Sequence, residues 1–430
     1  MSAGRASATA GLPDAIAQAV SQVDEMLAAS DRALEAKYRG ERPGRQPVHT
    51  AYVAADRFHP EQAADWGRQA LQALADCVPS SAGFSAAMGM TDELAVIVRE
   101  RVVAKLSTEP VEDLRLDFED GYKPAGDRDA AEDTDARAAA RDLAAAAAAG
   151  SAPPFTGIRC KSLEAVTRIR AIRTVSLFLA ELLAHGPMPA GFRLTLPKVS
   201  VADQVQAMVL LCDRWEQAFG LPAGTLAVEI QAETPQLILG ADGGSTIARC
   251  VHAGGERLTG VHYGTYDYSA ALGIAGEFQR LDHPAADHAR SVMQVAVAGT
   301  GVRLSDGSLN VLPTGSRADV VAAWQEHSRL VRRSLERGFY QGWDLHPAQL
   351  ASRYAATYGF FLAGAPRACD RLRSYADSAG SGTLEEPATA RALAGFLLRG
   401  LECGALRDAD ISSRCGLDRK TLSALRQDRR

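Results

Sequence analysis

The sequence predicts an α/β fold in which eight parallel strands, each followed by helical chain, close into a (β/α)8 barrel of the TIM type. Short β-prone runs alternate with helical stretches along most of the chain, an order that implies parallel pairing. An open doubly wound sheet is the alternative, but no G-x-G-x-x-G follows the first strand. The eight β-prone runs begin at His49, Leu114, Phe155, Phe192, Leu226, Leu258, Gly301 and Gly342.

Helices are expected between these strands, and several carry boundary signals. Gly150 and Gly220 stand where two of the helices should end, as is typical of C-caps. Ser200–Asp203 has the pattern of a capping box and predicts a helix start. Residues 78–110 form an excursion that the pattern does not assign. The expected helices cover residues 60–75, 134–149, 163–184, 200–219 and 318–337.

The two ends of the chain are expected to extend the barrel. Within residues 1–46, the first 12 should be disordered, and residues 13–37 form an amphipathic helix suited to packing or oligomerisation. A Pro- and Gly-containing linker leads into the barrel, which we place at 47–350. Residues 351–430 predict a helical C-terminal extension.

Composition narrows the functional classes. The chain has 430 residues, of which 47% are hydrophobic and 23% charged, and its net charge is -5. No global basic field would attract nucleic acid or an anionic membrane. The seven cysteines are scattered without a C-x-x-C pair, which argues against a disulfide framework or structural zinc. Neither a signal peptide nor an apolar run of about 18 residues is present, so we expect a cytoplasmic protein.

Charged side chains follow nearly every expected strand. In a barrel, the catalytic face lies where strands end and βα loops begin. One such residue is usually a solvated loop residue, but a set that converges on one face indicates a site. The set comprises Asp117, Glu119, Asp120, Arg159, Lys161, Lys198, Glu233, Asp267 and His346.

Two of these residues could hold a metal ion. Glu233 and Asp267 each end a short β-prone run, so both carboxylates should meet at the barrel mouth. Oxygen ligands without nearby Cys or paired His favour Mg²⁺ or Mn²⁺ over zinc. The alternative is that both residues simply close ordinary strands.

Seven short motifs add a resemblance to a known family. They occupy residues 52–58, 116–121, 157–160, 196–199, 231–234, 264–267 and 345–349. In this order they resemble motifs of the superfamily of the citrate lyase β-subunit, malyl-CoA lyase and HpcH/HpaI-type aldolases. Departures include the 34-residue separation of Glu233 and Asp267, Cys160-Lys161 after the arginine, and Thr265-Tyr266 before the aspartate.

The resemblance implies a barrel of the phosphoenolpyruvate/pyruvate-binding type that catalyses reversible carbon–carbon cleavage. Its substrate would be a 2-oxo or 3-hydroxy acid, with a CoA thioester equally admissible, and the reaction would pass through an enolate. The family's Mg²⁺ ligands correspond to Glu233 and Asp267, and two carboxylates leave most octahedral positions of the ion open. A homo-oligomer is also implied.

Roles for the remaining residues follow from their chemistry. Arg159 offers a planar fork for a substrate carboxylate or enolate oxygen, although a salt bridge to Glu119 or Asp120 weighs equally. Those two acids would orient Arg159 or a metal-bound water. Lys198 would add positive potential, with a Schiff base as the less favoured alternative. No general base is assigned.

The substrate pocket is expected to include Gly264, Thr265, His346 and Pro347. His346 is an acid/base candidate, but a structural turn at the pocket rim is favoured for it.

Other function classes remain open. One is a phosphoenolpyruvate-type barrel that moves phosphate or phosphonate, and another is a non-catalytic member that binds a metabolite. Residues 410–422 have the helix–turn–helix look of a small DNA-binding unit. A helical cap that packs on a neighbouring barrel is favoured, because the segment is short and the chain acidic.

Overall fold

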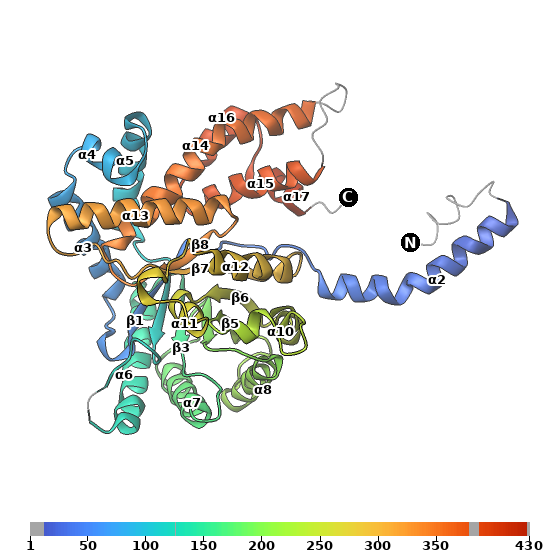
Figure 1. Ribbon diagram of the computed structural model, residues 1–430, viewed down its shortest axis with the longest axis horizontal. Helices are drawn as coiled ribbons and strands as arrows, with labels where there is room; N and C mark the ends of the chain where they lie inside the picture. The colour runs from blue at the N-terminus through green and yellow to red at the C-terminus, as the bar shows by residue number, and fades with distance from the viewer. Residues whose placement is uncertain (1–12, 125, 378–386, 428–430) are drawn as a thin grey trace.

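The structure is a computed structural model that describes residues 13–124, 126–377 and 387–427. Residues 1–12, where disorder was expected, lie outside the described residues. A barrel with flanking helices makes up most of the molecule (Figure 1).

Eight parallel strands close into a barrel in sequence order, with β8 paired to β1. The predicted fold class is therefore confirmed, and each strand begins within two residues of its expected start. The strands are β1 (His49–Ala54), β2 (Asp113–Asp117), β3 (Phe155–Arg159), β4 (Phe192–Leu196), β5 (Ala227–Ala232), β6 (Leu258–Tyr263), β7 (Arg303–Ser308) and β8 (Gln341–Asp344).

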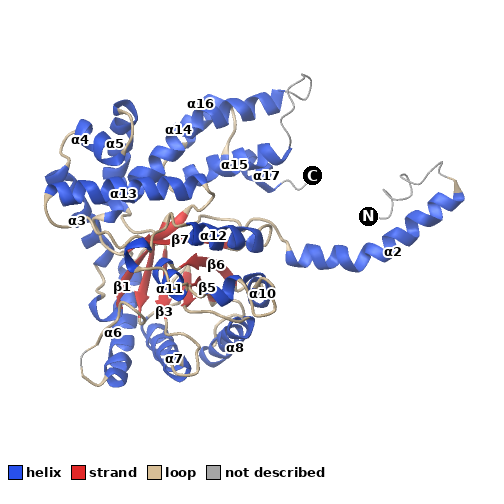
Figure 2. Cartoon of the chain, in the orientation of Figure 1, coloured by secondary structure: helices blue, strands red, loops and turns tan. Residues whose placement is uncertain are grey.

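Helices surround the strands, as Figure 2 shows in blue around red. Gly150 and Gly220 end α6 and α8 in the left-handed conformation, as predicted. The helices are α3 (Gln62–Cys77), α6 (Arg128–Ala149), α7 (Arg168–His185), α8 (Ala202–Phe219), α9 (Pro235–Ile238), α10 (Thr246–Gly254), α11 (Thr265–Ala271), α12 (Pro284–Val297) and α13 (Arg317–Glu336), with short 3-10 turns at Ala55–Arg57 and Gly276–Phe278.

The predicted capping box at Ser200–Asp203 is wrong. The side-chain oxygen of Gln204 accepts hydrogen bonds from the backbone N–H groups of Ser200 and Val201, at 2.8 and 3.2 Å. The Ser200 hydroxyl instead lies 3.3 Å from the Thr234 hydroxyl in the next βα loop. The helix start is thus capped from inside the helix, while the serine ties two loops of the barrel mouth together.

The barrel interior is polar where the strands face one another. Arg115 is fully buried and donates to Asp113 at 2.8 Å and to Glu229 at 2.7 Å. Thr50 and Gln341 extend this network, with bonds of 2.8 Å to Asp113 and 2.9 Å between them. Apolar side chains on the other face of the strands pack against the helices. The buried network of Arg115, Asp113 and Glu229, called the charged plug below, therefore lies beneath the barrel mouth.

The excursion that the sequence left unassigned consists of α4 (Ser81–Met88) and α5 (Asp92–Thr108). These helices pack with α14 (Gln349–Asp377), beside the first barrel helix. The chain ends in α15 (Pro387–Glu402), α16 (Asp408–Cys415) and α17 (Arg419–Gln427). Gly416 joins the last two helices, which gives the predicted helix–turn–helix shape. Packing of this cap on another barrel stays a prediction.

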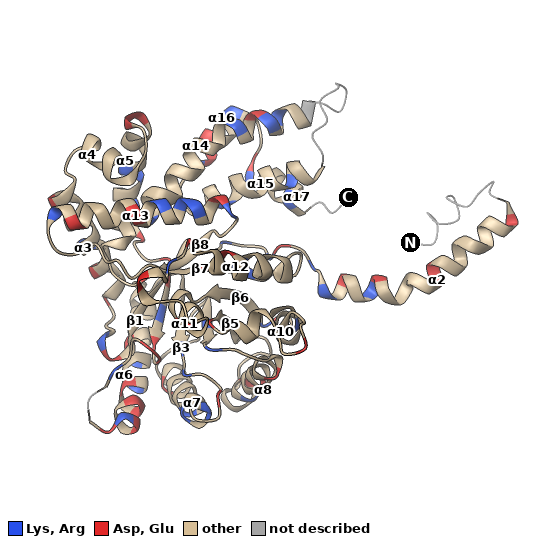
Figure 3. Ribbon diagram, in the orientation of Figure 1, with Lys and Arg blue, Asp and Glu red and all other residues tan. Residues whose placement is uncertain are grey.

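Helix α2 (Asp14–Lys37) projects from the body and buries none of its residues. Acidic and basic side chains are interspersed over the helices of the molecule (Figure 3). No helix among the described residues combines the length and apolar character that crossing a membrane requires.

Candidate active site

A cavity of about 710 Å³ opens at the carboxyl ends of the strands. Its lining contains four acidic residues, Asp117, Asp120, Glu233 and Asp267, and the guanidinium of Arg159. Aromatic side chains complete the wall, namely Tyr52, Trp66, Tyr266 and Trp343. Residues from several βα loops, far apart in sequence, thus share one concave site.

Arg159, at the end of β3, is held by Asp117 at the end of β2. Its Nε and Nη2 donate to the two Asp117 carboxylate oxygens, each at 2.7 Å. Nη1 lies 3.5 Å from Glu119. Burial disfavours the charged guanidinium, but Asp117 and Glu119 hold the pKa of Arg159 well above its ordinary value. The guanidinium is therefore a fixed cation. The expected ion pair with Glu119 is present, that with Asp120 is not among the contacts of the described residues, and the main partner is Asp117.

The loop after β2 fixes Asp117 in turn. Its carboxylate accepts hydrogen bonds from the backbone N–H of Glu119 at 2.9 Å and of Gly121 at 2.8 Å. A Cβ at Gly121 would lie 2.5 Å from Asp117 Oδ2, so a side chain there would displace the carboxylate. This loop is the structural reason for the acidic motif at residues 116–121.

Glu233, directly after β5, is buried against two neighbouring loops. The backbone N–H of Lys198 donates to its carboxylate at 3.0 Å, and Lys198 is the only non-glycine residue with positive φ in the described chain. A Cβ at Gly264 would lie 2.2 Å from Glu233 Cγ. Burial, with the charges of Glu119 and Asp267 nearby, raises the pKa of Glu233 to about 8.

Lys198 links the other carboxylates. Its ammonium group donates to Glu119 and to Asp120, the latter at 3.0 Å, and lies 3.9 Å from Asp267. Burial raises the pKa of Glu119 to about 7 and also raises that of Asp267, with Asp120 contributing to both. The sequence thus predicted correctly that these strand ends converge on one another.

The donor set fits a hard divalent cation. Glu233 and Asp267 line the same cavity, and the charge of Asp267 contributes to the raised pKa of Glu233. A cation bound between repelling carboxylates relieves that repulsion. Within the described residues, no three His, Cys, Asp or Glu side chains form a ready metal cluster. The fit therefore depends on two carboxylates, with the remaining coordination positions left to water or substrate.

Comparison with known proteins places the sequence in a family. The family described as "Domain of unknown function (DUF6986)" matches residues 27–430. The chain belongs to this family. No protein of curated function matches the sequence.

Solved structures similar to this DUF6986 chain include the magnesium/glyoxylate complex of malate synthase from Haloferax volcanii. That match has 13% identity and a TM-score of 0.48, and covers 90% of this chain and 100% of that chain. An HpcH/HpaI aldolase/citrate lyase family protein from Burkholderia cenocepacia J2315 matches with 15% identity and a TM-score of 0.40, covering 77% and 97%.

The remaining predicted residues of the DUF6986 chain lie in different places. Gly264 and Thr265 line the cavity, and the Thr265 hydroxyl donates to Ser308 O at 3.2 Å. His346 and Pro347 are not among the lining residues, whereas Leu345 is. His346 Nδ1 accepts from the backbone N–H of Ala348 at 3.2 Å, which is a bond of the turn that opens α14.

The sequence did not indicate two of the aromatic residues that line the cavity, Tyr52 and Trp66. Tyr52 lies under Arg159, with 4.9 Å from its ring centroid to the guanidinium carbon, and 4.9 Å from the ring of Trp343. The alternation of β1 could have placed Tyr52 inside the barrel, two residues before the strand ends. Trp66 comes from helix α3, and no local signal distinguishes it from an ordinary core residue.

Proposed function

We propose that the chain is a Mg²⁺- or Mn²⁺-dependent carbon–carbon lyase or aldolase. Its substrate would be a 2-oxo or 3-hydroxy acid, free or as a CoA thioester, and the reaction would pass through an enolate. One observation carries the proposal: Glu233 and Asp267 line a single cavity together with the fixed cation Arg159. The seven motifs that resemble the citrate lyase β-subunit and HpcH/HpaI superfamily support the same chemistry.

Glu233 and Asp267 are the residues that would hold the ion. A bound divalent cation supplies Lewis acidity where negative charge develops on the substrate. Gly264 and the backbone N–H of Lys198 fix Glu233 against the loops, so the carboxylate keeps its position before the ion arrives. Because the pKa of Glu233 is raised to about 8, the ion would compete with a proton for this carboxylate.

Arg159 would bind an acidic group of the substrate. Asp117 occupies Nε and Nη2, which fixes the plane of the guanidinium. A ligand would therefore meet Nη1, whose present contact is the ion pair with Glu119 at 3.5 Å. Glu119 and Asp120 hold the ammonium group of Lys198, so this lysine adds positive potential beside the metal ligands. A role as a Schiff-base nucleophile does not suit an amine kept charged by two carboxylates.

A direct assay tests the proposal. Purified protein is incubated with a panel of hydroxy acids and acyl-CoA thioesters, with and without Mg²⁺, and release of pyruvate, glyoxylate or oxaloacetate is measured. We expect Mg²⁺-dependent release that Glu233→Gln lowers at least about 100-fold, because a Lewis acid contributes several kcal/mol. Glu326→Gln, a change of a partly exposed residue on α13, is the matched control.

Four results would contradict the proposal. Release of product without added metal after chelation would exclude the metal role. Equal activity of the Glu233 and Glu326 variants would exclude the predicted ligand. Tight binding of a metabolite with no product from any substrate would favour a non-catalytic binding protein, and transfer of phosphate or phosphonate would favour the phosphoenolpyruvate-type alternative.

A further inference from the structure

The linker between α2 and β1 crosses the end of the barrel opposite the mouth. Arg42 donates to the backbone oxygens of Glu256 and Leu258, at 2.9 and 3.3 Å. Arg303, the first residue of β7, donates to the oxygens of Gly44 and Arg45, each at 2.5 Å. Two cavities of about 530 and 200 Å³ lie along this crossing, remote from the candidate active site.

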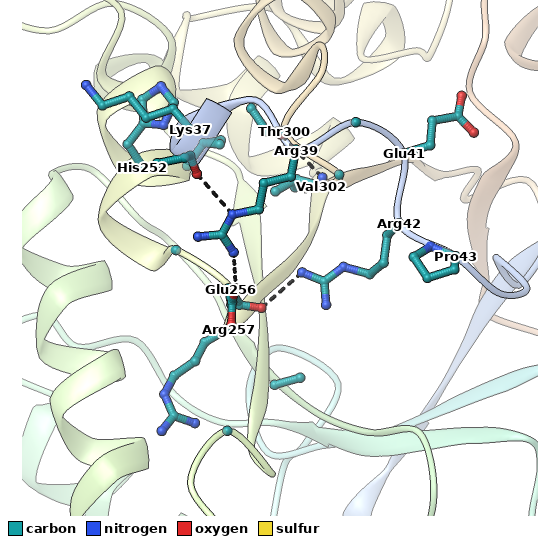
Figure 4. A pocket seen from close by; sticks show the side chains of 17 residues that line it. Lys37, Arg39, Glu41, Arg42, Pro43, His252, Glu256, Arg257, Thr300 and Val302 are labelled. Carbon is teal, nitrogen blue, oxygen red and sulfur yellow. Dashed lines mark hydrogen bonds and ion pairs between the residues drawn. The ribbon is translucent and has the colours of Figure 1, made fainter. Parts of the chain in front are cut away.

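Two of the arginines that line the larger cavity form ion pairs with carboxylates. Figure 4 shows Arg39 and Arg42 directed toward Glu256 from the linker, with Arg257 nearby. Arg39 forms an ion pair with Glu256. Arg257 forms one with Glu216, at 2.6 Å. Arg42 lines both cavities and, among the described residues, bonds only to main-chain oxygens.

The smaller cavity has unbalanced charge. Four guanidinium groups line it, from Arg42, Arg303, Arg399 and Arg426, against the carboxylates of Glu41 and Glu402. Arg399 donates to Glu41 at 3.0 Å, and Arg426 lies 3.7 Å from Glu402. Arg42 and Arg303 bond only to main-chain oxygens within the described chain. An excess of two positive charges remains.

Two further observations show that this excess is costly. The side chain of Arg426 is only 8% exposed. Its buried Nε has no hydrogen-bond partner among the described atoms, and its nearest carboxylate oxygen, from Glu41, lies 3.9 Å away. A buried charged donor without a partner is unfavourable. Burial lowers the pKa of Arg303 to about 10, and repulsion from Arg42 and Arg399 adds to this despite the attraction of Glu402. An anion bound between Arg426 and Arg303 would accept a hydrogen bond from the Arg426 Nε and would offset the repulsion that lowers the pKa of Arg303.

We propose that the smaller cavity binds a small phosphate-bearing anion, contacted by Arg42, Arg303 and Arg426. A phosphate monoester carries about -1.5 to -2 charges at neutral pH, which matches the excess of the lining. Guanidinium forks bind phosphate oxygens in pairs. A volume of about 200 Å³ holds roughly six or seven water molecules, so a phosphate group with a short substituent fits.

Glycines give such an anion close access to the main chain. Gly40, Gly44, Gly299, Gly301 and Gly338 line the cavity, and none places a side chain between the anion and the backbone. All five have positive φ, so each is also a position that favours glycine. The site lies between the base of the barrel and helices α15 and α17, and it does not depend on the function proposed for the mouth.

Phosphate titration of the full-length protein tests the inference. Inorganic phosphate and glycerol 3-phosphate are each titrated at constant ionic strength and pH 8, with binding followed by calorimetry. We expect saturable binding that Arg426→Gln weakens roughly tenfold or more, because a charge-assisted hydrogen bond is lost. We expect Glu402→Gln to tighten binding several-fold, because a repelling carboxylate is removed.

The two variants are expected to move affinity in opposite directions, which a loss of folding could not imitate. Arg329→Gln, an exposed change on α13, is the matched control and should leave affinity unchanged. Absence of binding by wild-type protein at concentrations up to about 20 mM, a range that covers very weak sites, would overturn the inference. Weaker binding in Glu402→Gln, or equal losses in Arg426→Gln and Arg329→Gln, would also overturn it.

Discussion

Replacing Gly264 with alanine tests the placement of Glu233 without altering the carboxylate. Gly264 has φ -104°, a value that alanine adopts without strain. The substitution should therefore not strain the backbone. The added Cβ would lie 2.2 Å from Glu233 Cγ, where ordinary contact begins near 3.4 Å. Glu233 must therefore withdraw by about 1 Å, and a displacement of this size at a catalytic group typically lowers the rate about 100-fold.

The stability of the Gly264→Ala variant provides an independent test of how Glu233 is packed. Overpacking of a buried site costs about 1–3 kcal/mol, which urea unfolding should detect. Gly276→Ala is the matched control, because a Cβ at Gly276 meets no atom within 4 Å. We expect weaker Mg²⁺ binding, slower turnover and lower stability in Gly264→Ala alone. If the two alanine variants match in Mg²⁺ affinity and in unfolding, the proposed packing of Glu233 is refuted.

Two predictions concern the protein interior. Arg115→Met should lower the free energy of unfolding by about 3–5 kcal/mol, because Asp113 and Glu229 lose their buried partner, and urea titration measures this. Burial lowers the pKa of His327 below its ordinary value of 6.5 despite the nearby Asp344, so its contribution to stability is present above pH 6.5 and is lost as the pH falls. His327→Gln should therefore reduce the acid-side slope of the unfolding free energy by up to about 1.4 kcal/mol per pH unit.

Surface variants provide the controls for both measurements. Arg329→Met removes an exposed arginine that forms ion pairs on α13, and should change stability by less than about 1 kcal/mol. A loss as large as that of Arg115→Met would contradict the role of burial. His185→Gln, a half-exposed change on α7, is the surface control for the histidine substitution. Parallel profiles for wild type and His327→Gln would contradict the pKa argument.

The strands could be predicted from the sequence because their signal is local. Each strand is a short β-prone run, and the strict alternation with helices leaves few topologies. Helix starts were less accurate where side chains compete for the backbone. Helix α7 begins at Arg168 rather than Leu163, since the Thr167 hydroxyl donates to Ser162 O at 2.9 Å and stabilises a preceding turn.

Helices α4 and α5 escaped prediction for a different reason. Their buried residues pack against α14, which lies more than 240 residues away in sequence. Val96 and Ile97 of α5 are exposed, so apolar residues occupy more than one face of this helix. The apolar residues of α5 therefore do not show a clear helical period in the sequence, and the tertiary contacts of this helix decide its conformation.

In the site, the sequence identified the strand ends but not every pairing between them. Arg159 pairs with Asp117 because the register of β2 and β3 sets these two residues side by side. Register between strands depends on packing of the whole barrel, and the sequence alone left Glu119 and Asp120 as the expected partners. The convergence of Glu233 with Asp267 needed no register, because both residues simply follow adjacent strands.

The charged plug beneath the mouth also restricts which substitutions this barrel can accumulate during evolution. Arg115 forms ion pairs with both Asp113 and Glu229. A single substitution that makes one of these residues neutral therefore leaves a buried charge without its partner. Neutral drift here should proceed through compensated replacements, in which an acid and the arginine disappear together. Homologues with an uncharged residue at the position of Arg115 should therefore also lack the acid corresponding to Asp113 or Glu229.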